Sequence, residues 1–148
     1  GKTNEFMRIY EATEPSDLLA EAFARLLPQL SERMTAPDRE AVARIVASPA
    51  TRQLVAAAED GRIVGLLSVA LYDVPSGRKA WIEDVVVDAA TRGRGIGEAL
   101  VREALALARR EGVARVMLTS NATRRASHRL YERMGFVRYE TDCFRLDL

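Results

Sequence analysis

Arginines and glycines lie close together in the middle of the chain, in an arrangement that favours the binding of an anion. They are Arg92, Gly93, Arg94, Gly95, Ile96 and Gly97. The valine run 85–87 comes shortly before them and predicts a buried strand, and an amphipathic pattern after them predicts a helix. Glycines at a helix start leave backbone N–H groups open to a ligand, and this end of a helix attracts negative charge. The sequence therefore predicts a phosphate-binding loop, the alternative being a glycine-rich connection without a ligand.

The spacing of the glycines excludes two common phosphate loops. The Walker pattern needs a Lys-Ser/Thr pair after its last glycine, and the dinucleotide fingerprint needs a glycine where Glu98 stands. What remains is Arg-x-x-Gly-x-Gly, which resembles the acyl-CoA diphosphate loop of the GNAT superfamily of N-acetyltransferases. Its defining positions are Arg92, Gly95 and Gly97. The resemblance implies that residues 92–97 bind the diphosphate of acetyl-CoA. It also implies that pantetheine and the acetyl carbonyl accept backbone hydrogen bonds from Val85, Val86 and Val87.

A second motif lies downstream, where Leu130-Tyr131 is followed by Gly135-Phe136. This spacing resembles the end of the GNAT motif. The resemblance implies that Tyr131 donates a proton to the departing CoA thiolate, whose pKa is about 8.5 to 9. The alternative is that Leu130, Tyr131 and Met134 form the buried face of a short helix. The position of Tyr131 relative to Gly135-Phe136 and the upstream loop favours the acid role.

A carboxylate on the central strand is the candidate base, because the attacking amine must lose a proton near the thioester. Simple alternation predicts that Trp81, Glu83, Val85 and Val87 share one face of this strand, opposite Asp84 and Val86. We expect Glu83 to be the base. Asp84, a water chain, or a structural ion pair between Glu83 and an arginine are the alternatives.

Two further polar residues fall near the second motif. Many family members carry an asparagine seven residues before the tyrosine, whereas this chain has Arg124 there and Asn121 at the expected strand end. Asn121 is expected either to contact pantetheine or to cap the helix that begins near Thr123. Arg124 is expected near the phosphates of acetyl-CoA, with a solvated helix face as the alternative.

Composition limits the classes of function. The 148 residues carry a net charge of +1, which gives no global attraction to nucleic acid, and no apolar run is long enough to cross a bilayer. We expect a single domain over residues 1–148 in a cytoplasmic protein. The lone Cys143 is expected to be buried on the last strand, and His128, the only histidine, does not suggest a metal site.

The periodicity of apolar residues predicts a mixed pattern of strands and helices. The resemblance implies an α/β fold with a mostly antiparallel central sheet, flanked by helices. Asp60-Gly61 is a strong hairpin signal between two of the strands, and Pro28 should weaken the first helix. The resemblance implies that the central strand splays from its neighbour to admit acetyl-CoA. Expected strands cover residues 7–11, 53–58, 63–72, 79–87, 113–119 and 136–147, and expected helices cover 15–27, 37–48, 96–111 and 123–134.

These observations predict an acetyl-CoA-dependent N-acetyltransferase that acts on a primary amine. The string from Ile82 to Asp88 is similar to that of glucosamine-6-phosphate N-acetyltransferases, which favours an amino sugar. A small-molecule acceptor is favoured over a protein lysine, because no acidic groove for a basic tail is evident. The alternative function is a non-catalytic module that senses CoA. The alternating C-terminal segment 136–148 predicts a homodimer.

Overall fold

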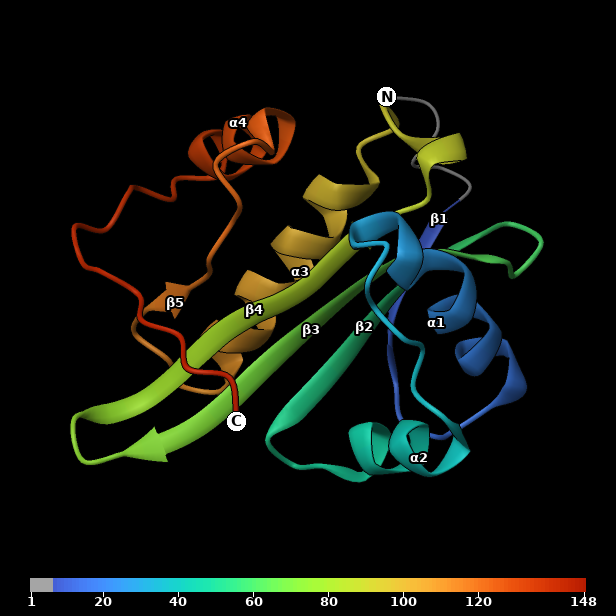
Figure 1. Cartoon of the computed structure of the whole chain (residues 1–148), viewed down its shortest axis with the longest axis horizontal. Coiled ribbons are helices and arrows are strands. Elements are labelled where there is room, and N and C mark those ends of the chain that lie inside the picture. The colour runs from blue at the N-terminus through green and yellow to red at the C-terminus, as the bar shows by residue number, and fades with distance from the viewer. Residues whose placement is uncertain (1–6) are drawn as a thin grey trace.

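The computed structural model describes residues 7–148 and contains a five-stranded sheet in the order β1-β2-β3-β4-β5 (Figure 1). Neighbouring strands are antiparallel except for β4 and β5, which run parallel. The expectation of a mixed, mostly antiparallel sheet is therefore confirmed. The strands are β1 (Met7–Ala12), β2 (Thr51–Ala58), β3 (Ile63–Val74), β4 (Gly77–Val87) and β5 (Val116–Met117).

Within residues 7–148, four α-helices and one short 3-10 turn accompany the sheet. Side-chain caps set the beginning of the first two helices, because Ser16 accepts a hydrogen bond from Leu19 N–H (3.1 Å) and Asp38 accepts one from Ala41 N–H (2.8 Å). Pro28 does not end the first helix, which continues to Leu30. The elements are α1 (Asp17–Leu30), α2 (Arg39–Ala47), η2 (Ala89–Thr91), α3 (Ile96–Arg110) and α4 (Arg125–Arg133).

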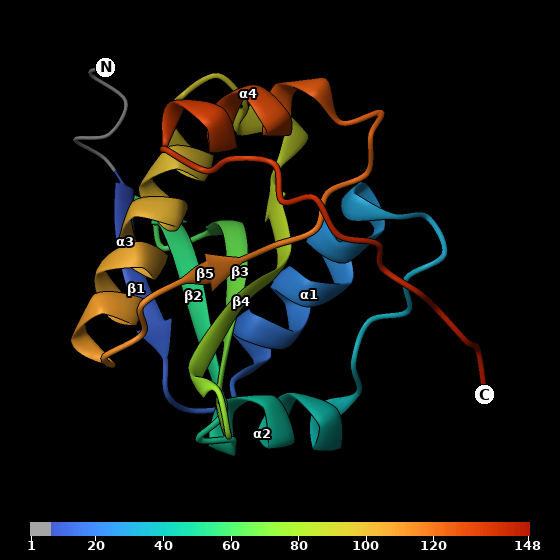
Figure 2. The ribbon, with the colours of Figure 1, turned by 90° about the vertical axis from the view of Figure 1, so that its left-hand side faces the viewer.

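The helices cover both faces of the sheet, with α3 on one side and α1 on the other (Figure 2). Leu100 and Leu107 of α3 pack with Leu67 and Val69 of β3, all at most 1% exposed. Phe23 and Leu26 of α1 pack against the opposite face. Two apolar layers therefore hold β4 between α1 and α3. Because β4 is fixed in this way, its last residues, which lead into the arginine-glycine loop, have a defined position.

A β-bulge interrupts the alternation of β4. Ser68 of β3 lies opposite Glu83 and Leu66 lies opposite Val86, so one residue of β3 faces two of β4. Asp84, at the bulge, has a φ of 49°, the only positive φ among the described non-glycine residues. The bulge shifts the pattern by one position. Even-numbered Ala80 and Ile82 belong to the cluster beneath α3, whereas after the bulge odd-numbered Val85 and Val87 pack there.

The bulge corrects one sequence-based expectation. Trp81, Glu83, Val85 and Val87 do not share one face by simple alternation, because the inserted residue moves Val85 and Val87 to the α3 side. Val86 is buried in the cluster on the α1 side. Glu83 and Asp84 both lie at the bulge, where each keeps part of its surface exposed to solvent.

The parallel pair β4-β5 separates soon after it forms. The strands pair only at Ala80 with Val116 and at Trp81 with Met117. Val86 and Val87 of β4 pair with Leu66 and Gly65 of β3, and none of residues 85–87 pairs with β5. The expected splay is therefore present, and β5 is shorter than the predicted strand 113–119. The open edge of β4 beyond Trp81 is where an extended ligand could receive backbone hydrogen bonds.

The C-terminal segment differs from its prediction. Residues 136–148 form no strand, and Cys143 is exposed rather than buried. Val137, Phe144 and Leu146 are 87%, 90% and 83% exposed. Alternation shows that a segment can pair in a sheet, but a strand forms only where a neighbouring edge supplies its hydrogen bonds. Within residues 7–148, no helix is long and apolar enough to cross a membrane.

Candidate active site

One cavity of about 190 Å³ gathers most of the chemically relevant side chains that the sequence singled out. It opens where β4 and β5 separate and is bounded by the β4 bulge, the segment after β5, α4 and the end of α1. Both predicted acid-base residues, Glu83 and Tyr131, line it. The lining residues are Leu30, Ile82, Glu83, Asp84, Val85, Leu118, Thr119, Ser120, Asn121, Arg124, Ser127 and Tyr131.

Glu83 enters the cavity from the bulge. Partial burial and then the neighbouring charge of Asp84 raise the pKa of the Glu83 carboxyl. No salt bridge to Glu83 is found among the described residues, so the alternative of a structural ion pair with an arginine is not supported. A carboxyl with a raised pKa is a stronger proton acceptor when ionised, which suits a general base.

Tyr131 enters the same cavity from α4. Its ring packs edge-on against Phe136, with ring centroids 5.8 Å apart and an interplanar angle of 63°. Burial raises the pKa of the Tyr131 phenol, and the positive charge of Arg124 partly opposes this shift. The phenol therefore stays protonated at neutral pH and can donate a proton. The ring contacts the core and the residue also lines the cavity, so packing of the ring is compatible with the predicted acid role.

Asn121 and Arg124 make local contacts at the start of α4. The Asn121 side-chain oxygen accepts hydrogen bonds from Thr123 N–H (2.9 Å) and the Thr123 hydroxyl (2.8 Å), so it stabilises the turn before the helix. Arg124 donates a hydrogen bond to the Leu30 carbonyl at the end of α1. This contact closes one side of the cavity and joins α4 to α1.

The arginine-glycine loop lies outside this cavity, at the far end of β4. Gly93 and Gly95 have φ values of 83° and 76°, in the left-handed region that favours glycine. Gly95 precedes α3 without a capping side chain, and the first helical hydrogen bond runs from Ala99 N–H to the Gly95 carbonyl (3.0 Å). The N–H groups of the first turn of α3 are therefore available to an anion.

Gly97 has a different reason to be glycine. A Cβ atom there would stand 3.3 Å from Leu130 of α4 and 3.7 Å from Val87 of β4. The buried Ile96 anchors the start of the helix beside it. Gly97 therefore allows α3 to pack closely against the element that carries Tyr131.

Sequence reasoning missed several residues of the cavity wall. Leu30 is too far from either motif in sequence to be found by spacing, since only the fold brings the end of α1 to α4. Ser127 could have been found, because it precedes Tyr131 by four residues and so shares its helix face. Thr119 and Ser120 extend the segment after β5 toward Asn121 and add polar groups to the wall.

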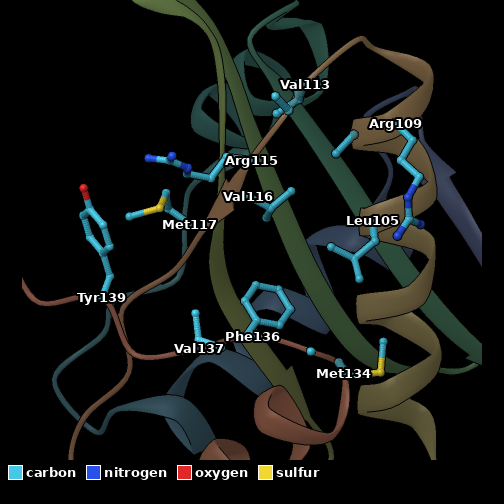
Figure 3. Close-up of a pocket in the computed structure, with 13 residues that line it drawn as sticks. Leu105, Arg109, Val113, Arg115, Val116, Met117, Met134, Phe136, Val137 and Tyr139 are labelled. Atoms are coloured by element: carbon cyan, nitrogen blue, oxygen red, sulfur yellow. The ribbon is translucent and has the colours of Figure 1, made fainter.

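A larger cavity of about 500 Å³ lies on the other side of β5, between α3 and Phe136–Tyr139 (Figure 3). Its lining is mostly apolar, and its charged side chains are Arg109 and Arg115. The Arg115 guanidinium lies 5.9 Å from the centroid of the Tyr139 ring. No carboxylate lines this cavity, so it lacks the acid-base pair of the first one.

The sequence is similar to those of known acetyltransferases. Residues 5–136 match the acetyltransferase (GNAT) family. The chain is 40% identical over 91 residues to glucosamine 6-phosphate N-acetyltransferase of Trypanosoma brucei brucei, covering 60% of this chain and 59% of that protein. It is 35% identical over 127 residues to glucosamine 6-phosphate N-acetyltransferase 1 of Oryza sativa subsp. japonica, covering 80% of this chain and 75% of that one.

Solved structures show the same fold. A Trypanosoma brucei acetyltransferase superposes with a TM-score of 0.77 at 31% identity, over 96% of this chain and 99% of that one. An aminoglycoside acetyltransferase from an uncultured soil metagenomic sample superposes with a TM-score of 0.86 over 98% of both chains, at 20% identity. The family match covers the loop, the bulge and the Tyr131 motif together. The chain belongs to the GNAT family of acetyltransferase enzymes.

Proposed function

We propose that this protein transfers the acetyl group of acetyl-CoA to a primary amine of a small molecule. The observation that carries the proposal is the shared cavity of Glu83 and Tyr131, which come from different elements and have opposite proton-transfer capacities. Glu83 suits a proton acceptor and Tyr131 suits a proton donor. Aminolysis of a thioester needs both, one at the amine and one at the sulfur.

The residues present fit acetyl-CoA as the donor substrate. The separation of β4 from β5 leaves backbone at Val85 to Val87 for an extended pantetheine arm, and the uncapped first turn of α3 suits a diphosphate. Arg92, Gly93 and Arg94 are exposed around that turn. We assign diphosphate binding to residues 92–97, and pantetheine binding to Val85–Val87 with Asn121 beside it. Arg124, expected near the phosphates, lines the cavity of Glu83 and Tyr131, so we assign it to the pantetheine arm.

The proposed chemistry moves two protons. Glu83, as a carboxylate, accepts one proton from the acceptor ammonium, and the neutral amine attacks the acetyl carbon. The C–N bond forms and the C–S bond breaks, and Tyr131 donates its phenolic proton to the leaving sulfur. The second proton that the nitrogen loses on becoming an amide reprotonates Tyr131, and the proton held by Glu83 returns to solvent, which restores both groups for the next turnover.

An amino sugar phosphate is our preferred acceptor class. The two relatives described above are named for acetylation of glucosamine 6-phosphate, and the chain matches one of them over 127 residues. Thiol release from acetyl-CoA in the presence of glucosamine 6-phosphate, polyamines, amino acids or lysine peptides tests this choice. We expect the highest kcat/KM with the amino sugar phosphate. A preference for lysine peptides would overturn the small-molecule assignment.

The pH dependence of Glu83→Gln tests the base. Glutamine keeps the shape but cannot accept a proton, so we expect the largest loss of turnover at low pH, where most acceptor amine is protonated. The loss should shrink as the pH rises and free amine becomes abundant. In the wild type, the raised pKa of Glu83 moves the acid limb of the rate profile upward, since the carboxylate forms only above that pKa. Rates between about pH 6 and 9 measure this, and a pH-independent defect would contradict the role of base.

We also propose that the protein forms a homodimer through residues 136–148. Val137, Phe144, Leu146 and Leu148 of this segment are exposed, and β5, the last strand of the sheet, pairs only with β4 among the described strands. An exposed apolar segment and an open strand edge favour pairing with a second copy.

Light scattering of Phe144→Asp/Leu146→Asp tests the dimer. Both side chains are more than 80% exposed within one chain, so the substitutions should leave the fold intact and give a monomer where the wild type gives a dimer. Leu18→Asp, at another exposed leucine (48%) on α1, is the control and should remain dimeric. A monomeric wild type at high protein concentration would rule out the dimer.

A further inference from the structure

Three polar side chains of α1 lie on one face of the helix and reach toward the start of the arginine-glycine loop. Glu21, Arg25 and Gln29 are each four residues apart, so they lie one above the other along α1. Arg25 is the centre of the row. Its guanidinium binds both carboxylate oxygens of Glu21, with its Nε 2.7 Å and its Nη2 3.2 Å from them. Glu21 therefore fixes the orientation of the Arg25 fork.

The other side of the Arg25 guanidinium faces the sheet. Its Nη1 donates to Asp88 Oδ2 at 3.2 Å, and its Nη2 donates to the Ile63 carbonyl at 2.7 Å. Asp88 follows the last residue of β4 and is 7% exposed, one of two buried polar side chains in the described part of the chain. A buried carboxylate needs partners for its charge, and Arg25 supplies the positive one.

Asp88 and Gln29 together hold the turn that leads into the loop. The second carboxylate oxygen of Asp88 accepts a hydrogen bond from Ala90 N–H at 3.1 Å. The side-chain oxygen of Gln29 accepts one from Ala89 N–H at 2.8 Å. The two N–H groups that begin η2 are thus satisfied by side chains that α1 either carries or orients. η2 ends at Thr91, directly before Arg92.

We propose that Arg25 and Gln29 are positioning residues for the acetyl-CoA loop, holding Asp88–Thr91 in the conformation from which residues 92–97 present their N–H groups to the diphosphate. The inference rests on the proposed function. Neither Arg25 nor Gln29 belongs to either of the two sequence motifs. Each acts on the ligand indirectly, through η2. Without either contact, residues 88–91 can leave this conformation. Binding of the ligand must then also order the loop, which lowers the affinity.

Gln29 is the sharper test, because its side-chain hydrogen bond reaches the turn directly, whereas Arg25 also holds the Ile63 carbonyl. Gln29→Leu removes the acceptor at nearly constant volume, and we expect affinity for CoA to fall about five- to tenfold, the effect of one hydrogen bond. Gln29→Glu keeps an oxygen acceptor for Ala89 N–H and should restore affinity to within about twofold. Calorimetry with CoA measures both values.

An acetyl donor without the diphosphate distinguishes a positioning role of these residues from a general effect on the structure. S-acetylpantetheine lacks the diphosphate, so Gln29→Leu should raise KM for acetyl-CoA while leaving kcat and the activity with S-acetylpantetheine unchanged. Arg25→Met should likewise raise KM for acetyl-CoA while leaving the activity with S-acetylpantetheine unchanged. Arg39→Met is the control, because it removes the exposed ion pair between Arg39 of α2 and Asp17 of α1 (2.8 Å), which does not reach the loop.

The outcomes are distinct. Affinity of folded Gln29→Leu for CoA within twofold of the wild type would overturn the inference while leaving the proposed function in place. Equal losses with acetyl-CoA and S-acetylpantetheine would also overturn it, because they would reveal a general structural effect. Failure of the wild type to bind CoA would overturn the proposed function, and the positioning role with it.

Discussion

Tyr131→Phe should lower turnover by about 10²-fold or more while leaving stability and affinity for acetyl-CoA unchanged. The substitution removes only the hydroxyl, and the ring keeps its edge-on contact with Phe136 and its place beside the core. Burial raises the pKa of the phenol, so the wild-type residue carries its proton throughout the neutral range. Without that proton the thiolate must leave unprotonated. Steady-state rates with acetyl-CoA and a saturating amine measure the loss.

Two comparisons make this result specific. Tyr10→Phe removes a hydroxyl from β1, outside the lining of the candidate active site, and should leave turnover unchanged. The loss in Tyr131→Phe should also persist across about pH 6 to 9, since free amine does not replace a missing acid. Near-wild-type turnover of Tyr131→Phe would end the acid role and leave the residue as part of the core.

Gly95→Val should weaken CoA binding by about 10- to 100-fold. The φ of 76° at Gly95 is strained for any side chain, and most for a β-branched one, at a cost of about 1–3 kcal/mol. The loop relieves that strain by leaving the conformation in which the first turn of α3 faces a ligand. Isothermal titration calorimetry with CoA measures the change in affinity.

The chain contains a matched control for this strain. Gly112, at the opposite end of α3, has the same φ of 76° and no atom within 4 Å of a Cβ placed there. Gly112→Val should therefore lower the free energy of unfolding by a similar amount without changing affinity for CoA. Unchanged affinity of a folded Gly95→Val variant would refute the assignment of residues 92–97 to the diphosphate.

The loop and the tyrosine motif were predictable because each is a local pattern. Gly95 and the start of α3 follow from the glycine spacing and the helical periodicity, and both lie where the sequence places them. Tyr131 falls on α4 in the predicted helix, ended near Gly135. Such features depend on neighbouring residues only, and their conformational preferences are visible in the sequence.

The bulge at Asp84 was not predictable in the same way. Alternation assumes one residue against one, whereas the register of β4 against β3 depends on how the two apolar layers pack around the strand. The consequence is local but important, because the bulge turns Glu83 and Asp84 toward the cavity wall. Residue type identified the candidate base, and its environment came only from the fold.

Contacts over long distances in sequence also escaped prediction. Arg25 and Asp88 are 63 residues apart, and Arg124 and Leu30 are 94 residues apart, so no spacing rule joins them. The C-terminal segment was overpredicted for a related reason. Its alternating apolar residues fit a strand, but β5, at the edge of the sheet, is only two residues long and offers little backbone for pairing.

The most direct test of the account is to measure released CoA and N-acetylated product together, with purified protein, acetyl-CoA and glucosamine 6-phosphate. We predict product formation that depends on the amine, with one N-acetyl group formed for each CoA released, and a rate that falls about 10²-fold or more in Tyr131→Phe. Calorimetric binding of CoA without amine-dependent release, with this acceptor or any other class of primary amine, would contradict the account. The protein would then be a CoA-binding module rather than an acetyltransferase.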